Sequence, residues 1–435
     1  MDSLLETRIV DGPVIWVVFT LAAAAFVYLL VRPPRIRWVL TALIGMLAGA
    51  LVAFATIWVV EAMNVFGVPL STQTDAWVVV TFAAIGLAVV NLWRSRWWRK
   101  LVAVVGVVLF ALAGTLGINA YFGLKPTIAS FLGVVVEHPI DLPTASPRPT
   151  DDPDAGKPLY ETWTPPADMP ATGKTGTQVI PATASGFTSR PAGLYLPPAA
   201  QVANPPALPF MILMMGQPGD PDPQYVAKVL DEYAARNNGL APVVLVADQL
   251  GDESIDPVCA DTAALGNAET FITQDVVSWA RANLPIEQDP EHWVIAGYSN
   301  GGGCSFKYGA KYPELWQNVL SISGEEYPGS EDPDTVVAKL FGGNQAAFDA
   351  EKPSSILASG AHAYPDTVGI FTVGGGDPAF IPAAQAASDA AAAAGWHTTF
   401  YVIPGAGHVL DALQGGFEKG FEILYPRLGL SAPTG

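Results

Sequence analysis

Four long apolar stretches near the start of the chain constrain its fold more than any other feature. They occupy residues 14–31, 38–60, 76–93 and 101–122. Each is long enough to cross about 30 Å of hydrocarbon as a helix. The first stretch has no basic segment before it and no small-residue cleavage site after it, which indicates an anchor rather than a removed signal peptide. The sequence therefore predicts an all-α transmembrane domain of four helices in residues 1–138.

The charges between these stretches predict an orientation. The connections after the first and third stretches contain only basic charged residues, namely Arg32, Arg35, Arg37, Arg94, Arg96, Arg99 and Lys100. Short loops rich in Arg and Lys stay on the cytoplasmic side of a membrane. We therefore expect a multi-pass protein of the cytoplasmic membrane whose N- and C-termini are both extracytoplasmic.

The rest of the chain divides into a linker and a domain. Residues 139–174 are rich in Pro, Thr, Asp and Gly, and we interpret them as a Pro-rich linker too poor in apolar residues to pack. From 175 to 435, short apolar runs alternate with helical patterns. This alternation predicts an α/β domain in which a mostly parallel sheet is flanked by helices. The expected strands include 210–215, 243–247, 293–296, 319–322, 368–373 and 399–403, and the expected helices include 223–237, 267–282 and 382–394.

A candidate nucleophile lies in the sequence Gly297-Tyr298-Ser299-Asn300-Gly301, between a predicted strand and a predicted helix. A serine at such a sharp turn is the arrangement of a nucleophile elbow, and flanking glycines let the strand and the helix approach each other closely. In a chain with 42 glycines the five-residue pattern alone arises easily by chance. Because the flanking elements fit, we predict that Ser299 is a nucleophile, against the alternative of an ordinary serine in a glycine-rich turn.

A serine hydroxyl needs an imidazole to accept its proton and a carboxylate to orient that imidazole. Among five histidines, His408 lies in a glycine-containing loop just after the last predicted strand, where catalytic residues of open α/β sheets collect. Asp377 follows the preceding strand, and the order Ser299, Asp377, His408 matches that of α/β-hydrolases. Glu325 and Glu326 are the alternative acids, and a helix N-cap is the alternative role for Asp377.

Two backbone N–H donors are needed to stabilise the oxyanion of an acyl-transfer intermediate. Asn300, the residue after the nucleophile, provides the first. The second is expected in the loop Met215–Gly219, where Gln217 is the predicted donor because Pro218 has no N–H. Such a mechanism requires no metal and no organic cofactor.

Taken in order, these motifs resemble those of the esterase D family of α/β-hydrolases, which includes the actinobacterial mycoloyltransferases. The resemblance spans about residues 175–425 and rests on the motifs MGQPG, DQLGDESIDPVCADTAALGNAETFITQDV, GYSNGGG, GGGDP and PGAGH. It implies an α/β-hydrolase catalytic domain at 175–435. It also implies the same site assignments, with Ser299, Asp377 and His408 as the catalytic triad and Gln217 and Asn300 as the oxyanion donors.

The chain contains two cysteines, Cys259 and Cys304. In the fold that the resemblance implies, the loop with Cys259 and the helix with Cys304 are neighbours. Because the expected compartment is oxidising, we predict a disulfide between them, with two buried free thiols as the alternative.

A four-helix anchor before such a domain resembles bacterial membrane esterases, among them aminoacyl-phospholipid hydrolases, which remove amino acids esterified to lipids. The net charge is −18, and nearly all of the acidic residues lie after position 140. This charge disfavours nucleic acid as a partner. It favours neutral or cationic head groups, such as that of an aminoacyl lipid, over anionic ones.

The sequence supports three hypotheses about function. The first is a membrane-anchored serine esterase that hydrolyses an ester of a membrane lipid at the outer leaflet through an acyl-enzyme on Ser299. The second is an acyl or mycoloyl transferase that passes the acyl group to a sugar or glycolipid. The third is a non-catalytic membrane receptor, since a fold alone does not establish activity.

Overall fold

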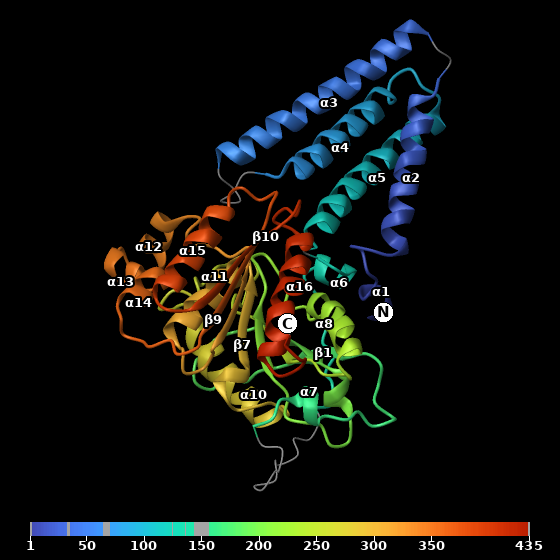
Figure 1. The fold of residues 1–435 in the computed structure, drawn as a ribbon. Helices are drawn as coiled ribbons and strands as arrows, with labels where there is room; N and C mark the ends of the chain where they lie inside the picture. Colours follow the sequence, from blue (N-terminus) through green and yellow to red (C-terminus); the bar gives the residue numbers. More distant parts are fainter. Residues whose placement is uncertain are drawn as a thin grey trace. The chain divides into compact units, whose positions relative to one another are not determined.

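The computed structural model describes residues 2–32, 35–63, 70–123, 125–134, 136–142 and 156–433 (Figure 1). The chain forms two compact units, Met1–Val136 and Glu137–Gly435, which are described in turn. The first unit contains the helices α1 (Asp2–Leu5), α2 (Pro13–Leu30), α3 (Ile36–Ala62), α4 (Thr72–Val90), α5 (Trp97–Phe122) and α6 (Ile128–Phe131).

The four long helices of the first unit agree with the four predicted stretches to within a few residues. They contain 18, 27, 19 and 26 residues and are long and apolar enough to cross a membrane. Large apolar side chains remain exposed along them, among them Leu43, Leu47, Phe54, Trp58, Val104 and Leu112. Apolar surface of this extent suits a lipid environment better than water. The unit is therefore suited to membrane association.

Small residues allow α3 and α4 to pack closely. A Cβ atom added to Gly49 would lie 2.1 Å from the carbonyl oxygen of Phe82, and one added to Gly86 would lie 2.0 Å from that of Gly45. Gly45 and Gly49 form a GxxxG pair on one face of α3. Interfaces of this kind stabilise helix pairs in lipid, where burial of apolar surface provides little driving force.

The second unit is built on an eight-stranded sheet with the order β1-β2-β4-β3-β7-β8-β9-β10. Its strands are β1 (Lys174–Gln178), β2 (Ala192–Leu196), β3 (Phe210–Met214), β4 (Val243–Ala247), β7 (Trp293–Tyr298), β8 (Asn318–Ile322), β9 (Val368–Gly374) and β10 (His397–Ile403). β1 pairs antiparallel with β2, and β2 pairs antiparallel with β4. The other six strands, β4, β3, β7, β8, β9 and β10, are parallel to one another. The short strands β5 (Asp261–Thr262) and β6 (Gly266–Asn267) form a separate hairpin.

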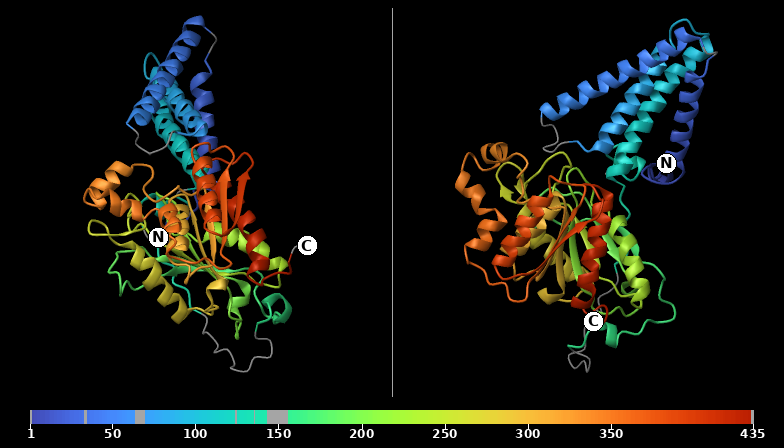
Figure 2. Two further views of the ribbon diagram at one scale, coloured as in Figure 1. Left: turned by 60° about the vertical axis from the view of Figure 1, so that its left-hand side comes forward. Right: turned by 45° about the horizontal axis from the view of Figure 1, so that its top comes forward.

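Helices cover both faces of this sheet (Figures 1 and 2). α11 (Asn300–Lys311), α14 (Pro353–Ala358) and α15 (Ile381–Ala393) pack together on one face, and α8 (Gln224–Arg236) and α16 (Leu410–Arg427) on the other. The remaining elements are α7 (Leu159–Thr162), η1 (Pro198–Gln201), α9 (Ala268–Thr270), the π-helix η2 (Phe271–Val276), α10 (Val277–Asn283), η3 (Pro290–His292), α12 (Pro333–Leu340) and α13 (Gln345–Ala350). The predicted fold class is confirmed: a mostly parallel sheet flanked by helices, after four apolar helices.

The predicted linker differs from the structure where it is described. Residues 143–155 lie outside the described residues, but Leu142, Leu159 and Trp163 pack against the core of the second unit. The indole of Trp163 donates a hydrogen bond of 2.9 Å to the carbonyl oxygen of Asn238. The described part of 139–174 is therefore packed, because these few apolar side chains find places on the domain.

Candidate active site

The order of the strands reverses near the centre of the sheet. From β3 the chain adds β4 on one side of the sheet and then crosses over to add β7 on the other side of β3. Ligands of open α/β sheets bind at the carboxyl ends of the strands at such a switch point. The carboxyl ends of β3 and β7 lead to the two predicted motifs, the loop Met215–Gly219 and the turn at Ser299.

Ser299 occupies a strained turn between β7 and α11. Its backbone has φ 54° and ψ −118°, a conformation that a residue with a Cβ seldom adopts. Its N–H donates to the carbonyl oxygen of Ile322 at 2.9 Å, which ties the turn to β8. The structure thus gives Ser299 the geometry of a nucleophile elbow.

The glycines of the motif are required by close backbone contacts. A Cβ atom on Gly297 would lie 1.9 Å from the carbonyl oxygen of Gly301, and one on Gly301 would lie 2.1 Å from that of Met214. Both distances are far below van der Waals contact. Only glycine therefore allows β7, α11 and β3 to converge at the serine.

The predicted triad residues form a continuous hydrogen-bonded series. The Ser299 hydroxyl lies 2.8 Å from Nε2 of His408, and Nδ1 of His408 lies 2.7 Å from Oδ2 of Asp377. With the Asp377 carboxylate accepting from Nδ1–H, Nε2 is left free to accept the serine proton. Ser299 and Asp377 are buried, whereas the side chain of His408 is 25% exposed. This arrangement can generate a nucleophilic alkoxide and hold the resulting imidazolium.

Two further contacts orient the imidazole. The ring of His408 lies 4.0 Å from that of Phe380 and 5.4 Å from that of Tyr298, measured between centroids. The turns after β9 and β10 are also joined, since the N–H of Gly376 donates to the carbonyl oxygen of Ala406 at 2.7 Å. These contacts hold the carboxyl of Asp377 and the imidazole of His408 in fixed positions relative to each other.

The alternative acids are not part of this series. Glu325 is buried, and its Oε2 accepts a 3.2 Å hydrogen bond from the N–H of Gly329, while Glu326 is exposed. Asp377 does not cap a helix through its side chain, because α15 begins at Ile381 and the Asp377 carboxylate contacts His408.

The predicted oxyanion residues lie on two adjoining segments. Asn300 is the first residue of α11, directly after Ser299. Gly216, which precedes Gln217, lies so close to the nucleophile that a Cβ added to it would be 3.1 Å from Cβ of Ser299. The peptide between Gln217 and Pro218 is cis. The predicted donor Asn300 therefore directly follows Ser299, and the predicted donor Gln217 directly follows a glycine that approaches that serine.

The structure also brings Gln249 to this place, a residue that the motifs did not single out. It follows β4, and its amide contacts both Met215 and Asn300. The sequence signals were its position shortly after a predicted strand, at the same edge of the sheet as Ser299, and its place at the start of the motif DQLGDES.

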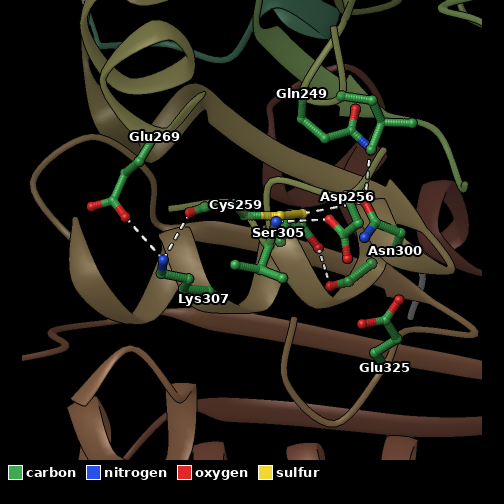
Figure 3. The surroundings of a disulfide bond; sticks show 12 residues. Gln249, Asp256, Cys259, Glu269, Asn300, Ser305, Lys307 and Glu325 are labelled. Carbon is green, nitrogen blue, oxygen red and sulfur yellow. Dashed lines mark hydrogen bonds and ion pairs between the residues drawn. A yellow bond between two sulfur atoms is a disulfide. The ribbon is translucent and has the colours of Figure 1, made fainter. Parts of the chain in front are cut away.

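Behind the elbow, the predicted disulfide between Cys259 and Cys304 is present (Figure 3). Two carboxyls lie near it, those of Asp256 and Glu325. Burial raises the pKa of both, and the charge of Asp256 raises the pKa of Glu325 further. Within the described residues, no group of three or more His, Cys, Asp or Glu side chains is arranged to hold a metal ion.

The chain resembles known proteins in sequence. The model of the family described as "Putative esterase" matches residues 188–415. An uncharacterized protein of Corynebacterium glutamicum is 30% identical over 453 aligned positions, which cover 99% of this chain and all of that protein.

Solved structures also resemble the chain. An S-formylglutathione hydrolase from Agrobacterium tumefaciens is 16% identical, with a TM-score of 0.47 over 60% of this chain and 97% of that one. A ferulic acid esterase is 17% identical, with a TM-score of 0.47 over 59% of this chain and 99% of that one.

Proposed function

Because this chain belongs to that esterase family, and four helices suited to a membrane precede its α/β-hydrolase domain, we propose that it is a membrane-anchored serine esterase with Ser299 as its nucleophile. The observation on which this proposal rests is the hydrogen-bonded series from Ser299 through His408 to Asp377. The family accounts for ester hydrolysis, and this geometry supports the mechanism.

In the proposed reaction, Oγ of Ser299 attacks the ester carbonyl while Nε2 of His408 takes the hydroxyl proton. The tetrahedral intermediate collapses as the imidazolium returns that proton to the leaving alcohol, which leaves an acyl-enzyme. Water then repeats the sequence and releases the acid. Asp377 holds Nδ1–H throughout and stabilises the imidazolium, without itself taking the proton.

The negative oxygen of each tetrahedral intermediate is stabilised by two backbone donors, the N–H groups of Gln217 and Asn300. Asn300 also begins α11, so the positive end of that helix dipole favours the developing charge. Donors fixed before the reaction need no reorganisation when the charge appears.

The proposed substrate is an ester of a membrane lipid at the outer leaflet. Four helices in the first unit are suited to a membrane, and the basic residues after α2 and before α5 favour a cytoplasmic location for those helix ends. The chain after α5 then lies outside the cytoplasmic membrane, where lipids are the most abundant nearby esters.

Among lipid esters, an aminoacyl lipid fits the charge of the chain. Its ammonium group lies beside the scissile carbonyl, and the chain has a net charge of −18. Burial and the charge of Asp256 raise the pKa of Glu331, whereas the charge of His408 lowers it, so an acidic side chain lies within electrostatic reach of the proposed base. Such a group favours a cationic acyl moiety over an anionic one.

Ester hydrolysis by the purified full chain in detergent tests the proposal. Ser299→Ala and His408→Ala should each reduce kcat at least about 10³-fold. Ser354→Ala and His397→Ala serve as matched controls, because both positions are exposed and away from the series, and they should retain full activity. Undiminished turnover by the Ser299→Ala variant would end the proposal.

Substrate class is tested separately with vesicles. Neutral lipid vesicles that contain either an alanyl-ester lipid or the matching propionyl-ester lipid differ at the reacting group only by the ammonium. We expect faster release of alanine than of propionate, with a preference that weakens as salt is added. Equal rates at low salt would remove the aminoacyl assignment but leave the esterase assignment intact.

A further inference from the structure

Gln249 joins the two segments that provide the proposed oxyanion donors. Its Nε2 donates a hydrogen bond of 2.6 Å to the carbonyl oxygen of Met215 and one of 3.1 Å to Oδ1 of Asn300. Gln249 and Asn300 are each only 2% exposed, so water does not compete freely for these contacts. One amide nitrogen has two hydrogens, and here each is used by a different segment.

The contact to Met215 fixes the loop after β3. Met215 lies one residue beyond the end of β3 and two residues before Gln217. A hydrogen bond to its carbonyl oxygen therefore sets the plane of the Met215–Gly216 peptide and, through it, the direction of the next N–H groups. The contact to Asn300 fixes the same amide to the first residue of α11.

The Asn300 side chain faces two buried carboxyls on its other side. Figure 3 shows its amide beside the carboxyls of Asp256 and Glu325, and that amide lowers the pKa of both carboxyls against the larger effect of burial. Sγ of Cys304 lies 3.7 Å from Oδ1 of Asn300. The disulfide and the two carboxyls thus lie beside the Asn300 amide, whose Oδ1 accepts the hydrogen bond from Gln249.

We propose that Gln249 is a positioning residue of the oxyanion hole, which sets the distance between its two donors. The proposal rests on the proposed function, because it takes Gln217 and Asn300 as those donors. The side-chain hydrogen bonds of Gln249 go to Met215 and Asn300, on either side of the proposed oxyanion hole. Oxyanion donors act only when they lie about 2.7–3.1 Å from the developing charge. Loss of a support that displaces one donor by about 1 Å reduces the rate roughly 10²-fold.

The first test replaces Gln249 by Ala in the full chain. We expect kcat for a soluble ester to fall about 10- to 100-fold while KM changes less than about threefold, because the contacts act on the intermediate. The affinity for an aryl boronic acid, which forms a tetrahedral adduct with the serine, should fall by the same factor as kcat/KM.

Gln201→Ala is a matched control. The Nε2 of Gln201 also donates to two carbonyl oxygens, those of Thr172 and Leu196, at 3.1 and 3.2 Å. Its loss removes the same number of hydrogen bonds from a place away from Ser299. If Gln249 has only a structural role, both variants should lose stability and keep their kcat.

Gln249→Glu provides a second test that does not depend on the tolerance of the alanine variant. A protonated carboxyl has one donor and can hold only one of the two segments, whereas an ionised carboxyl has none and repels both oxygens. We expect the activity of this variant, relative to the wild type at the same pH, to decrease as the pH rises through the titration of the new carboxyl.

The outcomes are distinct. Wild-type kcat in Gln249→Ala, a decrease matched by Gln201→Ala, or an activity ratio of Gln249→Glu that does not vary with pH would each overturn the positioning role. If Ser299→Ala stays active, the proposed function itself is wrong. If Ser299→Ala is inactive and Gln249→Ala is not impaired, only the role of Gln249 is wrong.

Discussion

Removal of the disulfide should destabilise the second unit by an amount that follows from the loop it closes. The bond joins Cys259, in the segment after β4, to Cys304 in α11, and both side chains are fully buried. The closed loop includes β7 and Ser299. A cross-link stabilises a fold mainly because it restricts the unfolded chain.

The magnitude follows from the sequence separation of 45 residues. For a loop of this length, the entropy lost by the unfolded chain is about 13 cal/mol/K, which is about 4 kcal/mol at 25 °C. We expect the free energy of unfolding of Cys259→Ala/Cys304→Ala to be lower than that of the wild type by about this amount. Cys304→Ala alone should lose nearly as much, because one remaining thiol closes no loop.

Urea unfolding of the full chain in detergent, followed by pulse proteolysis, measures the stability of the second unit without separating it from its anchor. Samples without reductant are compared first. Reductant should then destabilise the wild type once it has reduced the disulfide. It should leave the stability of both variants unchanged. A loss below about 1 kcal/mol in the double variant, or a single variant that loses only half as much as the double, would refute the loop argument.

Three further substitutions test other contacts. Asp377→Asn removes the charge opposite Nδ1 of His408, and we expect kcat to fall about 10⁴-fold with an unchanged urea midpoint; a fall below about tenfold in ester hydrolysis would contradict the orienting role. Lys307→Met removes a fully buried ammonium that lies 2.9 Å from Oε2 of Glu269. It should cost about 3–5 kcal/mol in urea unfolding, and Glu269→Gln should recover part of this loss; additive losses would argue against the pair. In Asp275, burial acts to raise the carboxyl pKa, but hydrogen bonds, that of Ser185 first, leave it lowered. The wild type should therefore exceed Asp275→Asn in stability by about 2–3 kcal/mol at pH 7, and the difference should disappear as the pH falls through about 4 and below; a difference that stays constant down to pH 3 would oppose this reasoning.

Local patterns in the sequence were sufficient for much of the fold. The four apolar stretches match α2 to α5, and the strand at 243–247 was predicted with its observed bounds. Hydropathy patterns of this kind are set by the period of the element and by what surrounds it, so they can be read without the tertiary structure.

The candidate site was predictable for a related reason. The glycines around Ser299 form a short motif between a predicted strand and a predicted helix, and the turns with Asp377 and His408 directly follow strands. In a parallel sheet, strand ends meet at one edge, so position along the chain already indicates proximity. The linker was less predictable, because the packing of Trp163 beside Asn238 depends on a surface formed elsewhere.

The sequence by itself therefore determined the elements, the fold class and the motifs around Ser299, because hydropathy period and glycine placement are local properties. Only the tertiary structure decided which side chains support that serine. Gln249 and Asn300 are 51 residues apart in the chain and meet because β4, β3 and β7 are adjacent in the sheet. The meeting of Asp256 and Glu325 behind Asn300 likewise depends on how loops from different strands pack. Contacts of this kind depend on strand order and packing, which no local pattern encodes.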